Sequence, residues 1–179
     1  MADYKFSVAM SIYKNDNPQY LKIALDSIID QTLPPDEIVL IGDGPVPQAL
    51  HDVVEKEIQR FPALRPLWQD KNRGLGGALR LAVENAKYDY IARMDSDDIS
   101  LPDRFEKQMK CFHDDNTLAV VGGMITEFSG EPTNIISERI LPLEDVGIKR
   151  FMRSRCGVNH VTVIFRKSEL LRAGNYQPG

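Results

Sequence analysis

Short apolar runs alternate with longer amphipathic segments along most of the chain. The runs of strand length are "FSVAMSI", "EIVLIGDGP", "PLWQ" and "YDYIARM". Between them, apolar residues recur at helical spacing in "PQYLKIALDSIIDQ", from Leu50 to Phe61, and in "GGALRLAVENA". Strands that alternate with helices of this length indicate right-handed βαβ units. The pattern therefore predicts an open α/β fold, Rossmann-like, in which a mainly parallel sheet carries helices on both faces.

Two of the predicted helices have recognisable start signals. Asn17 and Pro18 form a favourable pair of N-cap and first-turn residues for the first helix. For the fourth helix, Ser100 and Asp103 are expected as N-cap and N3 residues, with Pro102 in the first turn. The residues expected to share one face of that helix are Leu101, Phe105, Met109 and Phe112.

The alternation weakens after Thr126. "LAVVGGMIT" predicts a strand, "FSGEPTNIISERI" an extended excursion or hairpin, residues 145–153 a helix, and "HVTVIFR" a final strand. Neither an internal repeat nor a linker divides the sequence. We therefore expect residues 1–179 to form a single domain.

Composition narrows the possible functions. A formal net charge of −4 and a pI near 5.4 argue against a general nucleic-acid binder. The densest basic stretch, "KRFMRSR", is interpreted as the solvated face of a helix, the alternative being a patch that binds a polyanion or a membrane. Cys111 and Cys156 lie far apart, which favours buried thiols in a reducing compartment. The sequence has no apolar run of membrane-spanning length, so a cytoplasmic location is expected.

Polar or small residues follow each of the first four predicted strands. In open α/β sheets, ligands bind outside the carboxyl ends of the strands. If the sheet forms as predicted, these groups meet at one edge. They are Ser11 and Tyr13, then Asp43, then Asn72 to Gly74, and finally Asp95 to Asp98.

The acidic cluster suggests a metal site. In an extended chain, Asp95 and Asp97 would point the same way with Cα atoms about 6.5 Å apart. Such carboxylates repel one another unless a cation lies beside them, and oxygen ligands favour Mg²⁺ or Mn²⁺. The alternative is that these residues only form a turn and help to begin the next helix. Neither an EF-hand loop nor a dinucleotide-binding glycine pattern fits the sequence.

Three stretches together resemble family-2 glycosyltransferases, especially bacterial enzymes that assemble capsular and exopolysaccharide repeat units. They are "SVAMSIYKNDNPQYLKIALDSIIDQTLPPDEIVLIGDGPV", "NRGLGGAL" and "YDYIARMDSDDISLPDRFEKQ". The resemblance implies a GT-A-type fold and a nucleotide-diphosphate sugar donor, most often a uridine diphosphate sugar. It also implies a divalent metal, Mn²⁺ or Mg²⁺, inversion at the anomeric carbon, and a saccharide or lipid-linked saccharide as acceptor.

The resemblance also implies roles for individual residues. Ser11 and Tyr13 match positions beside the nucleoside, and Asp43 matches the acid that holds the base. Asp95 and Asp97 match the outer acids of an Asp-x-Asp motif, the first near ribose and phosphate and the second on the metal. Asn72, after the third strand, is assigned to the same nucleotide site. His160 matches a position on the acceptor side, although a satisfied interior histidine fits the sequence equally well.

The resemblance does not supply a catalytic base. In the family it comes from a Glu-Asp pair beyond a segment like "LLRAGNY", and this sequence reaches Gly179 before any such pair. We therefore expect the chain to be the donor-binding part of a longer glycosyltransferase, inactive alone, with any membrane association in sequence not present here. The alternative is a non-catalytic nucleotide-binding module. A receiver-like domain is disfavoured because "MSIYK" lacks the acidic pair that it would need.

Overall fold

The computed structural model describes residues 5–177 and confirms the predicted α/β alternation. The first four strands are β1 (Phe6–Ile12), β2 (Glu37–Gly42), β3 (Leu64–Trp68) and β4 (Tyr90–Arg93). The helices that follow them are α1 (Pro18–Ile29), α2 (Gln48–Arg60), α3 (Gly74–Asn85) and α4 (Arg104–Asp114). As predicted, Asn17 caps α1, its Oδ1 accepting a hydrogen bond from the backbone N–H of Gln19 at 2.8 Å.

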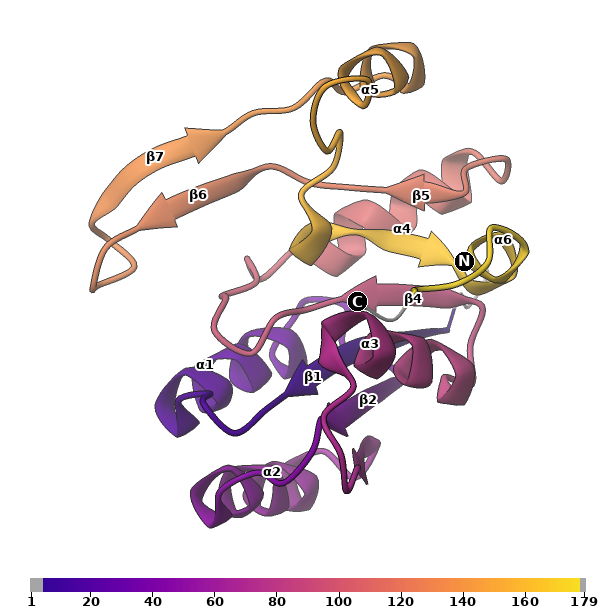
Figure 1. Ribbon diagram of the computed structural model, residues 1–179. Helices are drawn as coiled ribbons and strands as arrows, with labels where there is room; N and C mark the ends of the chain where they lie inside the picture. Colours follow the sequence, from indigo (N-terminus) through magenta and orange to yellow (C-terminus); the bar gives the residue numbers. More distant parts are fainter. Residues whose placement is uncertain (1–4, 178–179) are drawn as a thin grey trace.

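The central sheet has the strand order β3-β2-β1-β4-β8-β5 (Figure 1). Strands β1 to β4 pair in parallel, whereas β8 (Ile164–Arg166) pairs antiparallel with β4 and with β5 (Val120–Val121). The sheet is therefore open and mainly parallel. The carboxyl ends of β1 to β4 lie along one edge, because a parallel register aligns Ile12 with Gly42 and Gly42 with Trp68.

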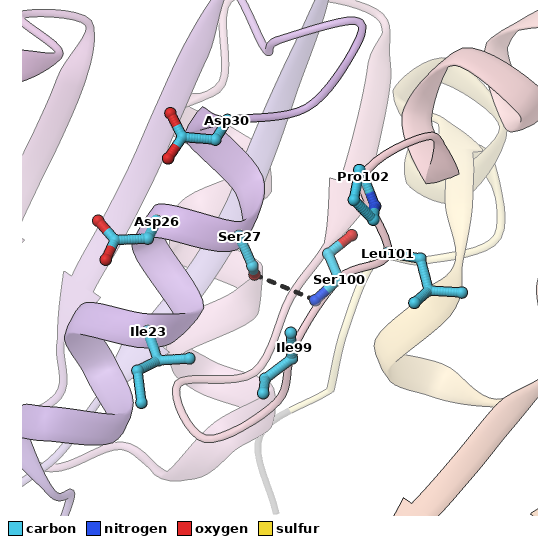
Figure 2. Close-up of a pocket in the computed structure, with 8 residues that line it drawn as sticks. All are labelled: Ile23, Asp26, Ser27, Asp30, Ile99, Ser100, Leu101 and Pro102. Atoms are coloured by element: carbon cyan, nitrogen blue, oxygen red, sulfur yellow. Dashed lines mark hydrogen bonds between the residues drawn. The ribbon is translucent and has the colours of Figure 1, made fainter. Parts of the chain in front are cut away.

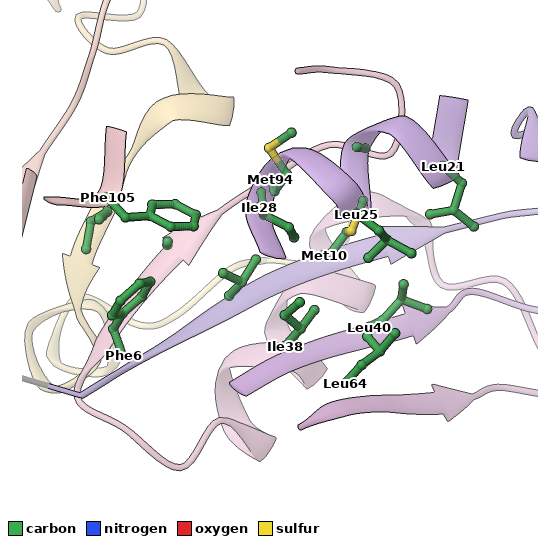
Figure 3. Packing of buried hydrophobic residues seen from close by; sticks show 14 of the residues in the cluster. Phe6, Met10, Leu21, Leu25, Ile28, Ile38, Leu40, Leu64, Met94 and Phe105 are labelled. Atoms are coloured by element: carbon green, nitrogen blue, oxygen red, sulfur yellow. The ribbon is translucent and has the colours of Figure 1, made fainter. Parts of the chain in front are cut away.

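Helices cover both faces of this sheet. On β1, Phe6, Val8 and Met10 join the core shared with α1, α2 and α4, whereas Ala9 joins the core shared with α3. Figure 3 shows the first of these cores, in which the rings of Phe6 and Phe105 meet edge to face at 5.1 Å. Helix α6 (Lys167–Arg172) adds Leu170 to the second core. Strands buried on both faces explain why β1 and β2 are nearly continuous apolar runs.

The predicted start of α4 is wrong. The helix begins at Arg104 rather than after Ser100, and Leu101 is 69% exposed instead of sharing the buried face. The reason is that α1 holds the preceding segment in place, since the backbone N–H of Ser100 donates to Ser27 Oγ at 3.0 Å (Figure 2). Phe105, Met109 and Phe112 do form the buried face as predicted.

Residue Gln31, just after α1, replaces the predicted local cap. Its buried side chain accepts a hydrogen bond from the backbone N–H of Phe105 at 3.2 Å and donates to the carbonyl oxygen of Leu101 at 2.7 Å. It also donates to the carbonyl oxygen of Ser27 at 2.7 Å. One amide therefore ties the end of α1 to the first turn of α4.

Residues 124–155 form an arm that projects beyond the sheet, where the sequence predicts an extended excursion or hairpin. It contains the antiparallel hairpin of β6 (Ile125–Phe128) and β7 (Ile135–Arg139), followed by helix α5 (Asp145–Phe151) (Figure 1). The strand expected over residues 118–126 is broken into β5 and the start of β6, and the one expected over residues 160–166 begins as a short 3₁₀ helix (His160–Thr162). Thr162 closes that turn because its Oγ1 donates to the carbonyl oxygen of Asn159 at 2.7 Å.

Two further observations concern the surface. Cys111 and Cys156 are both exposed, so the expectation of buried thiols is wrong. Cys111 lies on the outer side of α4, and Cys156 follows α5 in the arm, where little of the chain is buried. Within residues 5–177, none of the helices has the length and apolar character needed to cross a bilayer.

The Gln31 contacts give the first prediction. Replacing Gln31 with Leu keeps a similar volume but removes the acceptor of Phe105 N–H and the side-chain donor to the Ser27 carbonyl, while the Leu101 carbonyl keeps Arg104 N–H. We expect the free energy of unfolding to fall by about 2–4 kcal/mol, because buried polar groups left unpaired cost about 1–3 kcal/mol each. Urea denaturation measures the loss, with the exposed Gln59→Leu on α2 as control. Equal stability of the two variants would contradict this role of Gln31.

Candidate functional site

The loops after β2 and β3 are locked together around Asp43. One oxygen of its buried carboxylate, Oδ1, accepts a hydrogen bond from the backbone N–H of Arg73 at 2.7 Å. Asn72 donates from Nδ2 to the Asp43 carbonyl at 3.1 Å and accepts from Gly74 N–H at 3.1 Å. Gly44, at φ +87°, allows this close approach, because a Cβ there would lie 2.8 Å from Asn72 N. The Asn72 side chain therefore positions Asp43.

The second oxygen of Asp43 is available to a ligand. None of the described residues donates a hydrogen bond to Oδ2. Among these residues, the fully buried side-chain atoms without a partner are Arg93 Nε and Asn175 Nδ2, so Oδ2 is not fully buried. It is therefore reached by solvent even though the residue is only 5% exposed. A carboxylate oxygen held in this way can accept a hydrogen bond from a ligand N–H.

The loop after β1 contacts the acidic turn through Asp16, a residue that the sequence interpretation missed. Asp16 Oδ2 accepts hydrogen bonds from Tyr13 N–H at 3.1 Å and from Ser96 Oγ at 2.9 Å. Burial raises the pKa of Asp16, and the charges of Asp97 and Asp95 raise it further, while the two hydrogen bonds oppose the shift. The ends of β1 and β4 therefore meet as predicted, and the Tyr13 side chain is 42% exposed beside them.

The acidic turn lies over a buried cation. Arg93, 1% exposed, donates to Asp95 Oδ1 and to the carbonyl oxygen of Met94, and its Nε has no hydrogen-bond partner among the described residues. Its own carbonyl accepts from Arg104 Nη2 at 2.8 Å. Burial, followed by the charge of Arg93, lowers the pKa of Arg104 to about 10. The guanidinium groups of Arg93 and Arg104 partly offset the acids gathered here.

Four carboxylates gather at this point, those of Asp16, Asp95, Asp97 and Asp98. Burial raises the pKa of Asp98, and the charges of Asp95 and Asp97 act in the same direction. Ser96 and Asp97 form a turn, so the expected extended arrangement of Asp95 and Asp97 is wrong, because the strand has already ended at Arg93. Asp95 is engaged by Arg93, whereas Asp97 is exposed to solvent.

The donor set suits a hard divalent ion that is completed by a ligand. Among residues 5–177, no group of three or more His, Cys, Asp or Glu side chains is arranged to enclose a metal. Two carboxylates on an open turn fit Mg²⁺ or Mn²⁺, which usually keep waters and share substrate phosphates rather than occupying an all-protein cage. The residues present therefore fit a metal bound together with a phosphorylated ligand.

His160 and Tyr176 border the same cluster. His160 Nε2 and Tyr176 Oη are hydrogen-bonded at 2.8 Å, and their rings meet edge to face at 5.5 Å. Burial lowers the pKa of His160, helped by the charge of Arg93 and opposed by that of Asp95. Burial also raises the pKa of Tyr176 to about 12. Both side chains are therefore neutral near pH 7, and the Tyr176 contact was not foreseen from the sequence.

The structure brings most of the predicted residues to one edge of the sheet. Ser11 is half-buried near the end of β1, level with Ile41 on β2. A separate hollow of about 340 Å³ lies between α1 and residues 99–102 (Figure 2). Its lining contains none of the predicted site residues, and half of its lining residues are apolar, namely Ile23, Ile99, Leu101 and Pro102. The edge built from Asp43 and the acidic turn is the candidate site.

Comparison with known proteins identifies relatives of the whole described region. The family pattern described as "Glycosyl transferase family 2" matches residues 7–173. The chain is 39% identical over 173 residues to the amylovoran biosynthesis glycosyltransferase AmsE of Erwinia amylovora, covering 96% of this chain and 64% of that protein. It is 33% identical over 172 residues to an Escherichia coli UDP-Gal:alpha-D-GlcNAc-diphosphoundecaprenol beta-1,3-galactosyltransferase, covering 96% of this chain and 62% of that protein.

A solved structure shares the fold. The mannosyltransferase PcManGT of Pyrobaculum calidifontis, solved in complex with GDP-Man and Mn²⁺, superposes with a TM-score of 0.70 at 18% identity. The match covers 98% of this chain and 48% of that one. It confirms the expected GT-A fold. The chain thus spans a little under two thirds of the two sequence relatives and about half of this structural one.

The buried His160 gives a pH prediction. Because its pKa is lowered in the folded protein, the unfolded chain binds more protons between the two pKa values, so stability falls as pH drops through the ordinary histidine value near 6.5. We expect the free energy of unfolding to decline from pH 7 to pH 5, and the decline to be smaller in His160→Gln. Urea denaturation across this range measures both slopes.

The control for this prediction is His113→Gln, on the exposed side of α4. That variant retains His160, so it should keep the wild-type decline. If His160→Gln has the same slope as wild type, burial of His160 does not contribute to the pH dependence.

Proposed function

The chain belongs to glycosyl transferase family 2, and on that premise we propose that it binds the donor of an inverting, metal-dependent glycosyltransferase. The enzyme would transfer a sugar from a nucleotide-diphosphate donor, a uridine diphosphate sugar in our proposal, to an acceptor hydroxyl during assembly of a surface polysaccharide. The named activities of the Erwinia and Escherichia relatives support this class of reaction. The main observation behind it is the joint placement of Asp43 and the acidic turn at one sheet edge.

Each residue of the site has a role in this proposal. The free Oδ2 of Asp43 accepts a hydrogen bond from the N–H of the base, and the exposed ring of Tyr13 lies against the nucleoside beside Ser11. Asn72 acts indirectly, since both ends of its amide are used to hold the Asp43 loop. Asp95, fixed by Arg93, lies near the ribose and phosphates, and Asp97 is the side chain free to ligate a metal.

Charge explains why donor binding would require a metal. A diphosphate brought against Asp16, Asp95, Asp97 and Asp98 is repelled, because two arginines cannot neutralise both the acids and the phosphates. A bound Mn²⁺ or Mg²⁺ neutralises the diphosphate and orients it as a leaving group. The protein holds the Asp95 carboxylate against Arg93 and leaves the Asp97 carboxylate exposed to contact the metal.

The reaction breaks the bond between the anomeric carbon and the diphosphate oxygen. An acceptor hydroxyl attacks that carbon from the opposite face, and its proton passes to a general base. We assign no residue to that base. His160 lies on the acceptor side in our proposal, with Nε2 already bonded to Tyr176. A non-catalytic module would bind the donor in the same way, and transfer activity of the whole protein would distinguish it from an enzyme.

Metal-dependent nucleotide binding gives the next prediction. Thermal unfolding with UDP or GDP should show stabilisation by one of them that requires Mn²⁺ or Mg²⁺. A ligand at a hundredfold over its dissociation constant adds about 2.7 kcal/mol. Asp97→Asn should abolish the metal-dependent part, whereas Asp114→Asn, at the exposed end of α4, should behave as wild type. Stabilisation that is equal without metal, or unchanged in Asp97→Asn, would exclude the proposed metal ligand.

Asp43 supports a separate prediction about the base. Asp43→Asn retains an oxygen for Arg73 N–H but places an NH₂ group where the base N–H should donate. Hydrogen bonds to charged groups contribute about 1.5–3 kcal/mol, so nucleotide affinity should fall about 10- to 150-fold. Calorimetric titration with the stabilising nucleotide measures this loss, and the unliganded melting temperature checks the fold. An unchanged dissociation constant would show that Asp43 does not hold the base.

A further inference from the structure

The arm of residues 124–155 exposes large apolar side chains. None of the residues in β7 or α5 is buried. Four apolar residues along this part of the arm are 64–81% exposed, namely Ile136, Ile140, Leu143 and Val146. Figure 1 shows β7 and α5 on the side of the arm away from the six-stranded sheet. Where exposed apolar residues form one patch, that patch usually marks a surface that contacts a partner or a membrane.

The same part of the chain is locally basic. From Val146 to Arg155 it carries four cations and no acid, although two exposed acids, Glu144 and Asp145, directly precede this stretch and the whole protein has a net charge of −4. Lys149 pairs with Asp145 at 2.8 Å, and Arg155 lies over the Phe151 ring at 5.9 Å. Within residues 5–177, no carboxylate pairs with the other two cations, Arg150 and Arg153.

Helical spacing places apolar and basic residues on one side of α5. Val146, Lys149 and Arg150 are separated by three or four positions, so they project from the same side of α5, and Arg153 follows in the turn after the helix. The other side faces the body of the arm, because a Cβ on Gly157 would lie 2.7 Å from Met152 Cγ and 3.0 Å from Ile148 Cγ2. We define the outer face of the arm as Ile140, Leu143, Val146, Arg150 and Arg153.

We propose that the outer face of the arm docks on an anionic phospholipid surface. Such a surface supplies phosphates for the unpaired arginines and an apolar boundary for Leu143 and Val146, while the long arginine side chains reach between the two. A polynucleotide would satisfy the cations but leave the apolar side chains in water. A second copy of this acidic chain would bury the apolar side chains, but the arginines of two identical faces, Arg150 and Arg153, would repel each other.

This proposal differs from the sequence interpretation of "KRFMRSR" as a solvated helix face. The sequence shows the charges, whereas the structure adds that the neighbouring apolar residues are exposed beside them. The proposal does not rest on the donor site, and its test uses neither nucleotide nor metal. Failure here would therefore leave the proposed function untouched.

The test is sedimentation of the 179-residue protein with vesicles. We expect binding to phosphatidylglycerol–phosphatidylcholine vesicles, little binding to pure phosphatidylcholine, and loss of binding in 0.5 M salt as surface charges are screened. Each basic residue near an anionic surface is worth about a fivefold factor in affinity. Arg150→Glu/Arg153→Glu should therefore weaken binding by about 30-fold or more.

Matched variants distinguish the contribution of charge to vesicle binding from that of apolar contact. Lys107→Glu/Lys110→Glu on α4 changes the net charge by the same amount at exposed lysines and should bind as wild type. Leu143→Ser/Val146→Ser keeps the charge and should also weaken binding. Equal binding of the Arg150→Glu/Arg153→Glu variant and wild type would overturn the proposal. So would a dimer in light scattering that Leu143→Ser/Val146→Ser dissociates, or binding to heparin without binding to vesicles.

Discussion

A guanidinium group almost without solvent access lies beneath the acidic turn, and the arrangement of the candidate site depends on it. A buried cation is tolerated only when it is paired and hydrogen-bonded. Arg93 meets this condition through Asp95 and the Met94 carbonyl, so the chain just after β4 has one favourable path. Along that path, Asp95 forms an ion pair with Arg93 and Asp97 remains exposed to solvent. The same path also places a positive charge beside His160, which helps to keep that imidazole neutral.

The strands and most helices of the fold were predictable because their signals are local. Strands β1 and β2 are buried on both faces, so their sequences are nearly unbroken apolar runs with boundaries that polar residues mark. The start of α4 was not predictable in this way. "SLPD" carries a plausible local cap, but the acceptor for Phe105 N–H is Gln31, 74 positions earlier. A distant side chain decided the boundary, and no local pattern contains that information.

The candidate site was predictable to the extent that it follows from strand ends. Asp43, Asp95 and Asp97 each come directly after a buried strand, so topology alone brings them to one edge. Asp16 was missed because it precedes a helix cap and looks like a surface loop residue, although it bonds Ser96 across 80 positions. Arg93 was hidden within an apolar run. An arginine at the end of a buried strand is itself a signal, since burial of such a charge requires a partner.

Different interactions hold the candidate site and the arm in place. The sheet edge of the candidate site is held by two packed cores and by hydrogen bonds that link loops far apart in sequence, so its geometry is set by the protein alone. The arm has a two-stranded hairpin and a short helix without buried residues, and isolated hairpins are only marginally stable. We therefore expect its direction to depend on what it contacts. If that contact is a lipid surface, as we propose, the arm would set how the candidate site faces the membrane.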